Sequence, residues 1–187
     1  MEDKIYSEYC AILAEELQPA MGCTEPIAVA YCAALARKTL GCLPEDVQVY
    51  ASANIIKNVK SVVVPNTGGQ RGLTVAAAAG IVAGDADAKL QVLAGITPEQ
   101  VEQIAGYEKR GIVHVHPSEK DYIFDIQVRV SAGGHTAFAE IAGFHTNVIR
   151  LEQDGDVLLD RPYTEEGPKH ATDRSLLTVE RIVEFAD

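Results

Sequence analysis

The chain has 187 residues and a formal net charge of −11 at pH 7, with 47% hydrophobic residues and a mean hydropathy of +0.01. This length allows a domain with a real core, and the composition is that of an ordinary globular protein. No apolar stretch reaches membrane-spanning length, and the lysines and arginines form no basic stripe of the kind that binds nucleic acid. We therefore expect neither a membrane nor a nucleic-acid partner.

The ends of the sequence and its cysteines bear on the cellular compartment. The N-terminal residues Met1–Lys4 are charged and lack a signal-peptide core, which predicts a cytoplasmic protein. The four cysteines match no zinc-binding spacing and contain no CxxC motif. Disulfides are not expected in a reducing compartment. We expect Cys32 and Cys42 to fill the core.

The first half of the chain is predicted to be mainly helical, with one strand at 46–53 and a short apolar run at 62–64. Thr24 is the expected N-cap of the second helix, and Thr97 with Pro98 opens the last one. The helices are predicted, in chain order, at residues 3–17, 25–40, 73–83, 86–93 and 97–109.

The second half changes to a pattern of short alternating strands, which predicts an antiparallel meander with one buried face over 111–160. A final apolar helix is expected from Ser175 to Asp187. The predicted fold class is α+β, an N-terminal helical layer packed on a mostly antiparallel β-sheet. Residues 1–162 would form this domain, and 163–187 a linker and the start of a helix that leads to a C-terminal helical half outside the chain.

The first candidate site is the run Gly22–Pro26 at the start of the second helix. A helix N-terminus offers unpaired N–H groups and a partial positive charge, and Gly22 lets a ligand approach the backbone. The same field favours a thiolate, so the pKa of Cys23 is expected to be lowered. A thiolate can act as nucleophile, base or metal ligand. The alternative is an ordinary capped helix with a passive cysteine.

The second candidate combines two polar segments. Asn54, Lys57 and Asn58 follow a strand, and the glycine-rich loop 65–72 precedes a helix, where successive amides could hold an anion. The loop lacks the spacing of nucleotide-binding motifs, and a tight turn is the alternative.

The third candidate is the segment Gly143–Asn147, in which His145 stands at a strand end and could carry a proton or bind a ligand. A plain hairpin turn with Asn147 is the alternative. His114 and His116 share a strand face, but no third metal ligand is evident.

Four motifs in this order resemble the L-cysteine desulfidase family, which is related to the iron–sulfur L-serine dehydratases. They are Gln18–Ala28, Ser52–Asn54 with Lys57–Asn58, Val64–Gly68 with Gly72, Ala77, Ala78 and Gly80, and His145–Asn147. Asn66 stands where the family usually has glycine, and asparagine tolerates the left-handed conformation that such a turn needs.

The resemblance implies an N-terminal half of an enzyme that cleaves L-cysteine to pyruvate, ammonia and sulfide with a [4Fe–4S] cluster held by three cysteines. Cys23 would be the one cluster ligand in this chain, so the fragment alone is expected to hold no cluster and to be inactive. The implied partners are a small amino-acid substrate and the C-terminal half of the same protein, with a homodimer left open.

The resemblance also implies roles for individual residues. Cys23, Lys57 and His145 are the catalytic candidates. Substrate binding is implied for Thr24, Glu25, Asn54, Asn58, Thr67, Gly68 and Asn147. Two other readings stay open. One is a lyase that acts on L-serine or another β-substituted amino acid, and the other is a non-catalytic module that binds a substrate or anion or serves assembly.

Overall fold

The structure, a computed structural model, describes residues 2–17, 19–163 and 171–187. Its internal contacts divide the chain into two units, one formed by Met1–Pro19 with Glu166–Asp187 and the other by Ala20–Glu165. We call them the terminal unit and the central unit. The sequence-based division differed, because it placed the first helix in the same domain as the sheet. Residues 164–170 of the expected linker lie outside the described residues.

The terminal unit pairs the first and last helices of the chain. It consists of α1 (Asp3–Glu16), the 3-10 turn η2 (Arg174–Leu176) and α6 (Val179–Ala186). The ring of Phe185 lies 5.1 Å, centroid to centroid, from the rings of both Tyr6 and Tyr9. The Tyr9 hydroxyl donates to the backbone oxygen of Leu176 at 3.1 Å. These contacts explain why α1 groups with the C-terminal residues.

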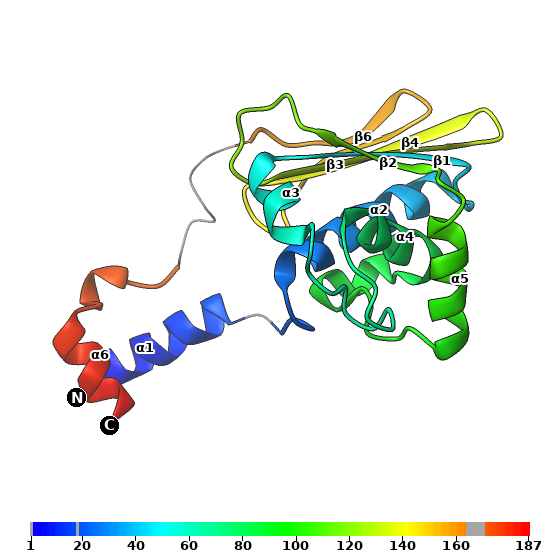
Figure 1. Ribbon diagram of the computed structural model, residues 1–187. Helices are drawn as coiled ribbons and strands as arrows, with labels where there is room; N and C mark the ends of the chain where they lie inside the picture. Colours follow the sequence, from blue (N-terminus) through cyan, green and yellow to red (C-terminus); the bar gives the residue numbers. More distant parts are fainter. Residues whose placement is uncertain (1, 18, 164–170) are drawn as a thin grey trace. The chain divides into compact units, whose positions relative to one another are not determined.

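The central unit places its long helices on one face of a single sheet (Figure 1). Within the part of the chain that is described, the sheet has six strands in the order β2-β1-β3-β4-β5-β6. The helical elements are α2 (Thr24–Leu40), α3 (Ala53–Val59), α4 (Leu73–Ala83), the 3-10 helix η1 (Ala86–Gln91) and α5 (Pro98–Glu108). The strands are β1 (Asp46–Ala51), β2 (Val113–Pro117), β3 (Asp125–Ala132), β4 (His135–Ala142), β5 (Val148–Gln153) and β6 (Asp156–Asp160).

One part of the predicted topology is wrong. The expected meander covered 111–160 and therefore included β2, but β2 does not pair with β3. Instead β1 lies between them, parallel to β2 and antiparallel to β3. A parallel pair needs a long crossover, and here α3, α4 and α5 supply it. The meander is confined to β3 through β6, whose pairs are all antiparallel.

The core lies between the sheet and the buried helices α2 and α4. Alternate residues of β3, namely Ile126, Val128 and Val130, are fully buried on the side of the helices. The two helices meet through small side chains, and a Cβ atom built on Gly80 would lie only 2.0 Å from the backbone oxygen of Ala30. This arrangement of a helical layer on a largely antiparallel sheet confirms the predicted α+β class.

Three local predictions also need correction. The polar segment after β1 forms the helix α3, and the expected helix 86–93 is a 3-10 helix interrupted at Lys89, where φ is 49°. Cys42 is exposed, whereas Cys32 is buried as expected.

Among the described residues, no helix combines the length and apolar character needed to cross a bilayer.

Candidate active site

Cys23 lies at the N-terminus of α2, where the chain turns into the buried helix. It is itself the N-cap, so the prediction that Thr24 caps this helix is wrong by one residue. Gly22 has a φ of 142°, and a Cβ atom there would sit 3.5 Å from the ring of Pro65. The backbone conformation at this turn therefore favours glycine, and it presents the thiol of Cys23 at the surface.

Glu25 collects the polar side chains around this turn. Its Oε2 atom accepts a hydrogen bond from Cys23 Sγ at 3.1 Å and a longer one from Thr24 Oγ1 at 3.5 Å. Its Oε1 atom accepts from Asn58 Nδ2 of α3 at 3.3 Å. The carboxylate thus joins the first turn of α2 to α3. We call Cys23, Glu25, Asn58 and His145 the thiol cluster.

His145 lies in the turn between β4 and β5, and the charge of Glu25 acts on its imidazole. Its ring packs edge-on against Phe124, with centroids 4.7 Å apart. The Nε2 atom is buried and has no hydrogen-bond partner among the described residues. Asn147 shapes the turn, because its Nδ2 atom donates to the backbone oxygen of Ala142 at 2.8 Å. A ring nitrogen that no protein group occupies keeps its capacity to accept or donate a hydrogen bond.

The charges of the cluster follow from burial and from Glu25. Burial raises the pKa of the Cys23 thiol, and the Glu25 carboxylate raises it further, so the expected lowering by the helix N-terminus is wrong. The hydrogen bond from Cys23 is the main cause of a lowered Glu25 pKa. Burial lowers the pKa of His145, opposed by the charge of Glu25. Near neutral pH the cluster is therefore a thiol, a carboxylate and a neutral imidazole.

Other predicted site residues have different surroundings. Asn54 and Lys57 are exposed on α3, and neither side chain makes a hydrogen bond or ion pair within the described part of the chain. Thr67 is fully buried, and its hydroxyl donates to the backbone oxygen of Val64 at 2.7 Å, inside its own loop. Gly68 faces Val101 of α5, whose Cγ1 atom would lie 3.0 Å from a Cβ atom built there. These contacts fix the shape of the loop, and an anion site at its backbone amides stays a prediction.

Sequence reasoning missed Phe124, which packs on His145. The signal was weak, because Phe124 falls within a predicted strand and reads as one of its buried positions. The left-handed conformation expected at Asn66 is confirmed by its φ of 59°.

Within the central unit, Cys32 and Cys42 do not lie beside Cys23. Cys42 follows the far end of α2, about 25 Å away for a helix of this length, and Cys32 is buried between them. His116 Nε2 donates a hydrogen bond to Gln48 Oε1 at 2.7 Å. No group of three His, Cys, Asp or Glu side chains in the described ranges could hold a metal ion. The described residues of this chain do not fit a [4Fe–4S] cluster.

Replacing Glu25 by glutamine is expected to speed the alkylation of Cys23 several-fold near neutral pH. Removal of the carboxylate charge lowers the pKa of the thiol, and the thiolate is the form that reacts. Site-specific rates with iodoacetamide, read by peptide mass spectrometry, measure the effect. Cys42, exposed at the other end of α2, is the internal control. An unchanged rate at Cys23 would contradict the electrostatic role of Glu25.

Comparisons with known proteins place the chain beside longer proteins. It is 44% identical over 186 residues to a UPF0597 protein of Desulfitobacterium hafniense (strain Y51), covering all of this chain and 43% of that protein. It is 40% identical over 183 residues to a UPF0597 protein of Treponema denticola, and the match covers 97% of this chain and 42% of that protein. A UPF0597 protein of Fusobacterium nucleatum subsp. nucleatum is 39% identical over 187 residues, with 100% and 44% covered.

These relatives correct the family expectation. No family model matches the chain, and no solved structure matches it. The relatives carry the name UPF0597, which states no activity, and not the name of a cysteine desulfidase or serine dehydratase. The expected membership in the L-cysteine desulfidase family is therefore wrong. The chain is similar, over its whole length, to less than half of the length of these UPF0597 proteins.

Proposed function

We propose that the thiol cluster is the acid–base part of an active site that β-eliminates a small β-substituted amino acid. L-cysteine, which would give pyruvate, ammonia and sulfide, is the substrate we put first, and L-serine is the alternative. The observation that carries the proposal is the hydrogen bond between Cys23 Sγ and Glu25 Oε2, 3.1 Å long, beside the buried and unpartnered Nε2 atom of His145.

Each member of the cluster has a role in this reaction. The Glu25 carboxylate, whose pKa is lowered, suits the substrate's ammonium group and not its carboxylate. The neutral imidazole of His145 is the base that accepts the proton from Cα, and the Cys23 thiol donates a proton to the leaving sulfur as the Cβ–S bond breaks. The resulting enamine hydrolyses to pyruvate and ammonia. Transfer of a proton from His145 back to Cys23 through solvent restores the starting state.

The chain supplies part of such a site. Because it spans 43% of its Desulfitobacterium relative, we propose that residues elsewhere in a longer protein complete the site and acidify the Cα proton. We place the reaction in the cytoplasm, where the exposed thiols of Cys10, Cys23 and Cys42 would stay reduced.

The test is the activity of the protein at the full length of its reading frame. With L-cysteine, release of sulfide and pyruvate is expected, and Cys23→Ala or His145→Gln should lower kcat/KM by at least about 100-fold, as for loss of a general acid or base. Cys42→Ala, the matched exposed thiol, should change it little.

Three outcomes contradict parts of the proposal. If neither L-cysteine nor L-serine yields pyruvate, the lyase is excluded. If only L-serine does, the leaving group is a hydroxyl and the substrate choice is wrong. If Cys23→Ala retains full activity, the cluster is not catalytic, and the alternative of a binding or assembly module takes its place.

A further inference from the structure

The face of the sheet that is turned away from the helices carries a second set of polar and aromatic side chains. Along β4, Ala137, Ala139 and Ile141 face the helical core, so Phe138 and Glu140 point to the other face. In the described part of the central unit, the helices lie on the opposite side of the sheet (Figure 1). This outer face is therefore where the polar strand residues come together.

A cavity of about 360 Å³ lies on this outer face. Its volume falls in the range of pockets that hold small molecules. Three strands and the loop before β3 contribute to its wall, which is lined by Tyr50, Glu119, Lys120, Gln127, Arg129 and Phe138. It shares no residue with the thiol cluster.

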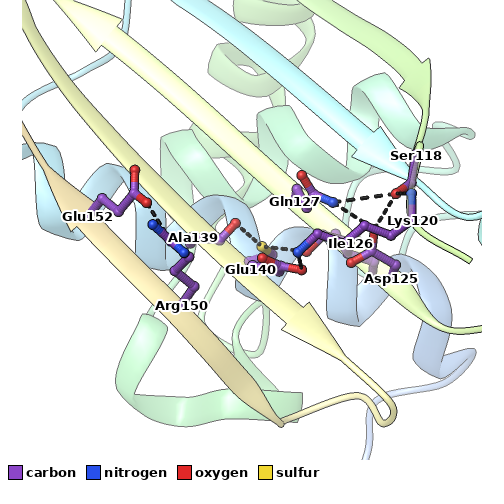
Figure 2. A network of polar contacts seen from close by, with 10 residues as sticks. Ser118, Lys120, Asp125, Ile126, Gln127, Ala139, Glu140, Arg150 and Glu152 are labelled. Carbon is purple, nitrogen blue, oxygen red and sulfur yellow. Dashed lines mark hydrogen bonds and ion pairs between the residues drawn. The ribbon is translucent and has the colours of Figure 1, made fainter. Parts of the chain in front are cut away.

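Buried carboxylates hold two of the lining residues in place (Figure 2). Lys120 donates to Glu140, which is 1% exposed. Gln127 Nε2 donates to Asp125 Oδ2 at 2.8 Å, and the hydroxyl of Ser118 donates to the same oxygen at 2.5 Å. Asp125 is fully buried. These bonds tie the 118–120 segment to the sheet, so the wall of the cavity is already formed before anything binds.

Two charges at the cavity remain uncompensated. Neither Arg129 nor Glu119 forms an ion pair within residues 2–17, 19–163 and 171–187. The guanidinium of Arg129 is held over the ring of Phe138, with its central carbon 4.9 Å from the centroid. The charge of Lys120, by contrast, is balanced by Glu140. The wall thus offers one positive group, held over the 7% exposed Phe138, one negative group and the ring of Tyr50.

We propose that this cavity binds a small zwitterionic amino acid with an aromatic or bulky apolar side chain. Its carboxylate would pair with Arg129, its ammonium group with Glu119, and its side chain would pack on the ring of Tyr50. A simple anion or cation would satisfy one of the two charges and leave the other without a partner. The inference is independent of the proposed lyase site.

Binding of L-phenylalanine, followed by calorimetry or by amide chemical shifts of the whole chain, tests this assignment. Saturable binding with a Kd of about 1 mM or lower is expected. Glycine lacks the side chain, phenylacetate the ammonium group and phenethylamine the carboxylate, so each should bind at least about tenfold more weakly, the loss expected for one charged hydrogen bond or an equivalent apolar contact.

Variants separate the two charges. Arg129→Gln should weaken the binding of L-phenylalanine about tenfold and leave the binding of phenethylamine unchanged. Glu119→Gln should likewise weaken the binding of L-phenylalanine about tenfold, and it should leave the binding of phenylacetate unchanged. Arg110→Gln is the matched control. The central guanidinium carbon of Arg110 also lies over a ring, 5.2 Å from the centroid of Tyr107 in α5, and Arg110 does not line the cavity. Absence of saturable binding, equal binding of phenylacetate, or the same loss with Arg110→Gln would overturn the proposal.

Discussion

Replacing Gly80 by alanine is expected to destabilise the central unit by about 3 kcal/mol or to prevent its folding. A Cβ atom at this position would lie 2.0 Å from the oxygen, 2.7 Å from the carbonyl carbon and 2.9 Å from the Cα atom of Ala30. These are backbone atoms of α2, so no side chain can rotate to make room. The two helices would have to move apart and would lose the close packing between them.

Gly106→Ala is the matched control. Gly106 lies inside α5, and a Cβ atom there would meet nothing within 4 Å. Alanine should therefore stabilise the helix by about 0.5–1 kcal/mol. Urea unfolding measured by circular dichroism gives both values. Similar midpoints for Gly80→Ala and the unchanged protein would show that α2 and α4 do not pack as closely as described.

Loss of the Lys120 ammonium group is expected to cost about 2 kcal/mol at neutral pH, because it leaves Glu140 buried without a cation. We discount the usual range for a buried pair since Lys120 is 40% exposed, whereas Glu140 is 1% exposed. Lys38→Gln is the matched control. Its partner is Asp87, both side chains are more than half exposed, and the expected cost is below about 1 kcal/mol.

The destabilisation caused by Lys120→Gln is expected to depend on pH. Burial raises the pKa of Glu140, and Lys120 opposes that rise. In Lys120→Gln the folded-state pKa lies further above the unfolded value, so the folded protein binds its proton more tightly. In this variant, the contribution of protonated Glu140 to the free energy of unfolding is fully present below about pH 4, the pKa of the unfolded state. It is lost as the pH rises through the pKa of the folded state. The cost of Lys120→Gln should shrink on acidification, and Glu140→Gln in the same chain should remove this dependence. A cost independent of pH would contradict the role of Glu140.

Local patterns were sufficient to predict most helices and strands of the chain. Thr97 and Gln100 form the expected capping box at the start of α5, and the alternation of Ile126, Val128 and Val130 marks the buried face of β3. What such patterns lack is the partner of each strand. Nothing within 46–51 says that this strand pairs with two others that come much later in the chain, so the order of the sheet was predicted wrongly.

The site was predictable only where it depends on local sequence. Glycine, cysteine and proline at a helix start indicated where Cys23 lies, but the effect of Glu25 on its pKa depends on a side-chain conformation. Proximity of His145 to Glu25 depends on the tertiary fold. Some motif residues turned out to serve packing. Gly80 touches α2, and Thr67 bonds its own loop, so the sequence pattern alone does not separate residues that pack the fold from residues that form a site.

The placement of β1 between β2 and β3 has a consequence for how the chain folds. Val47 pairs with Val113 on one side and with Val130 on the other. Both partner strands of β1 are therefore synthesised much later than β1 itself. The hairpins of β3 through β6, in contrast, join neighbours in the chain and form quickly. We expect insertion of β1 to be the late, slow step, and until then its apolar face and both of its edges are open to wrong partners.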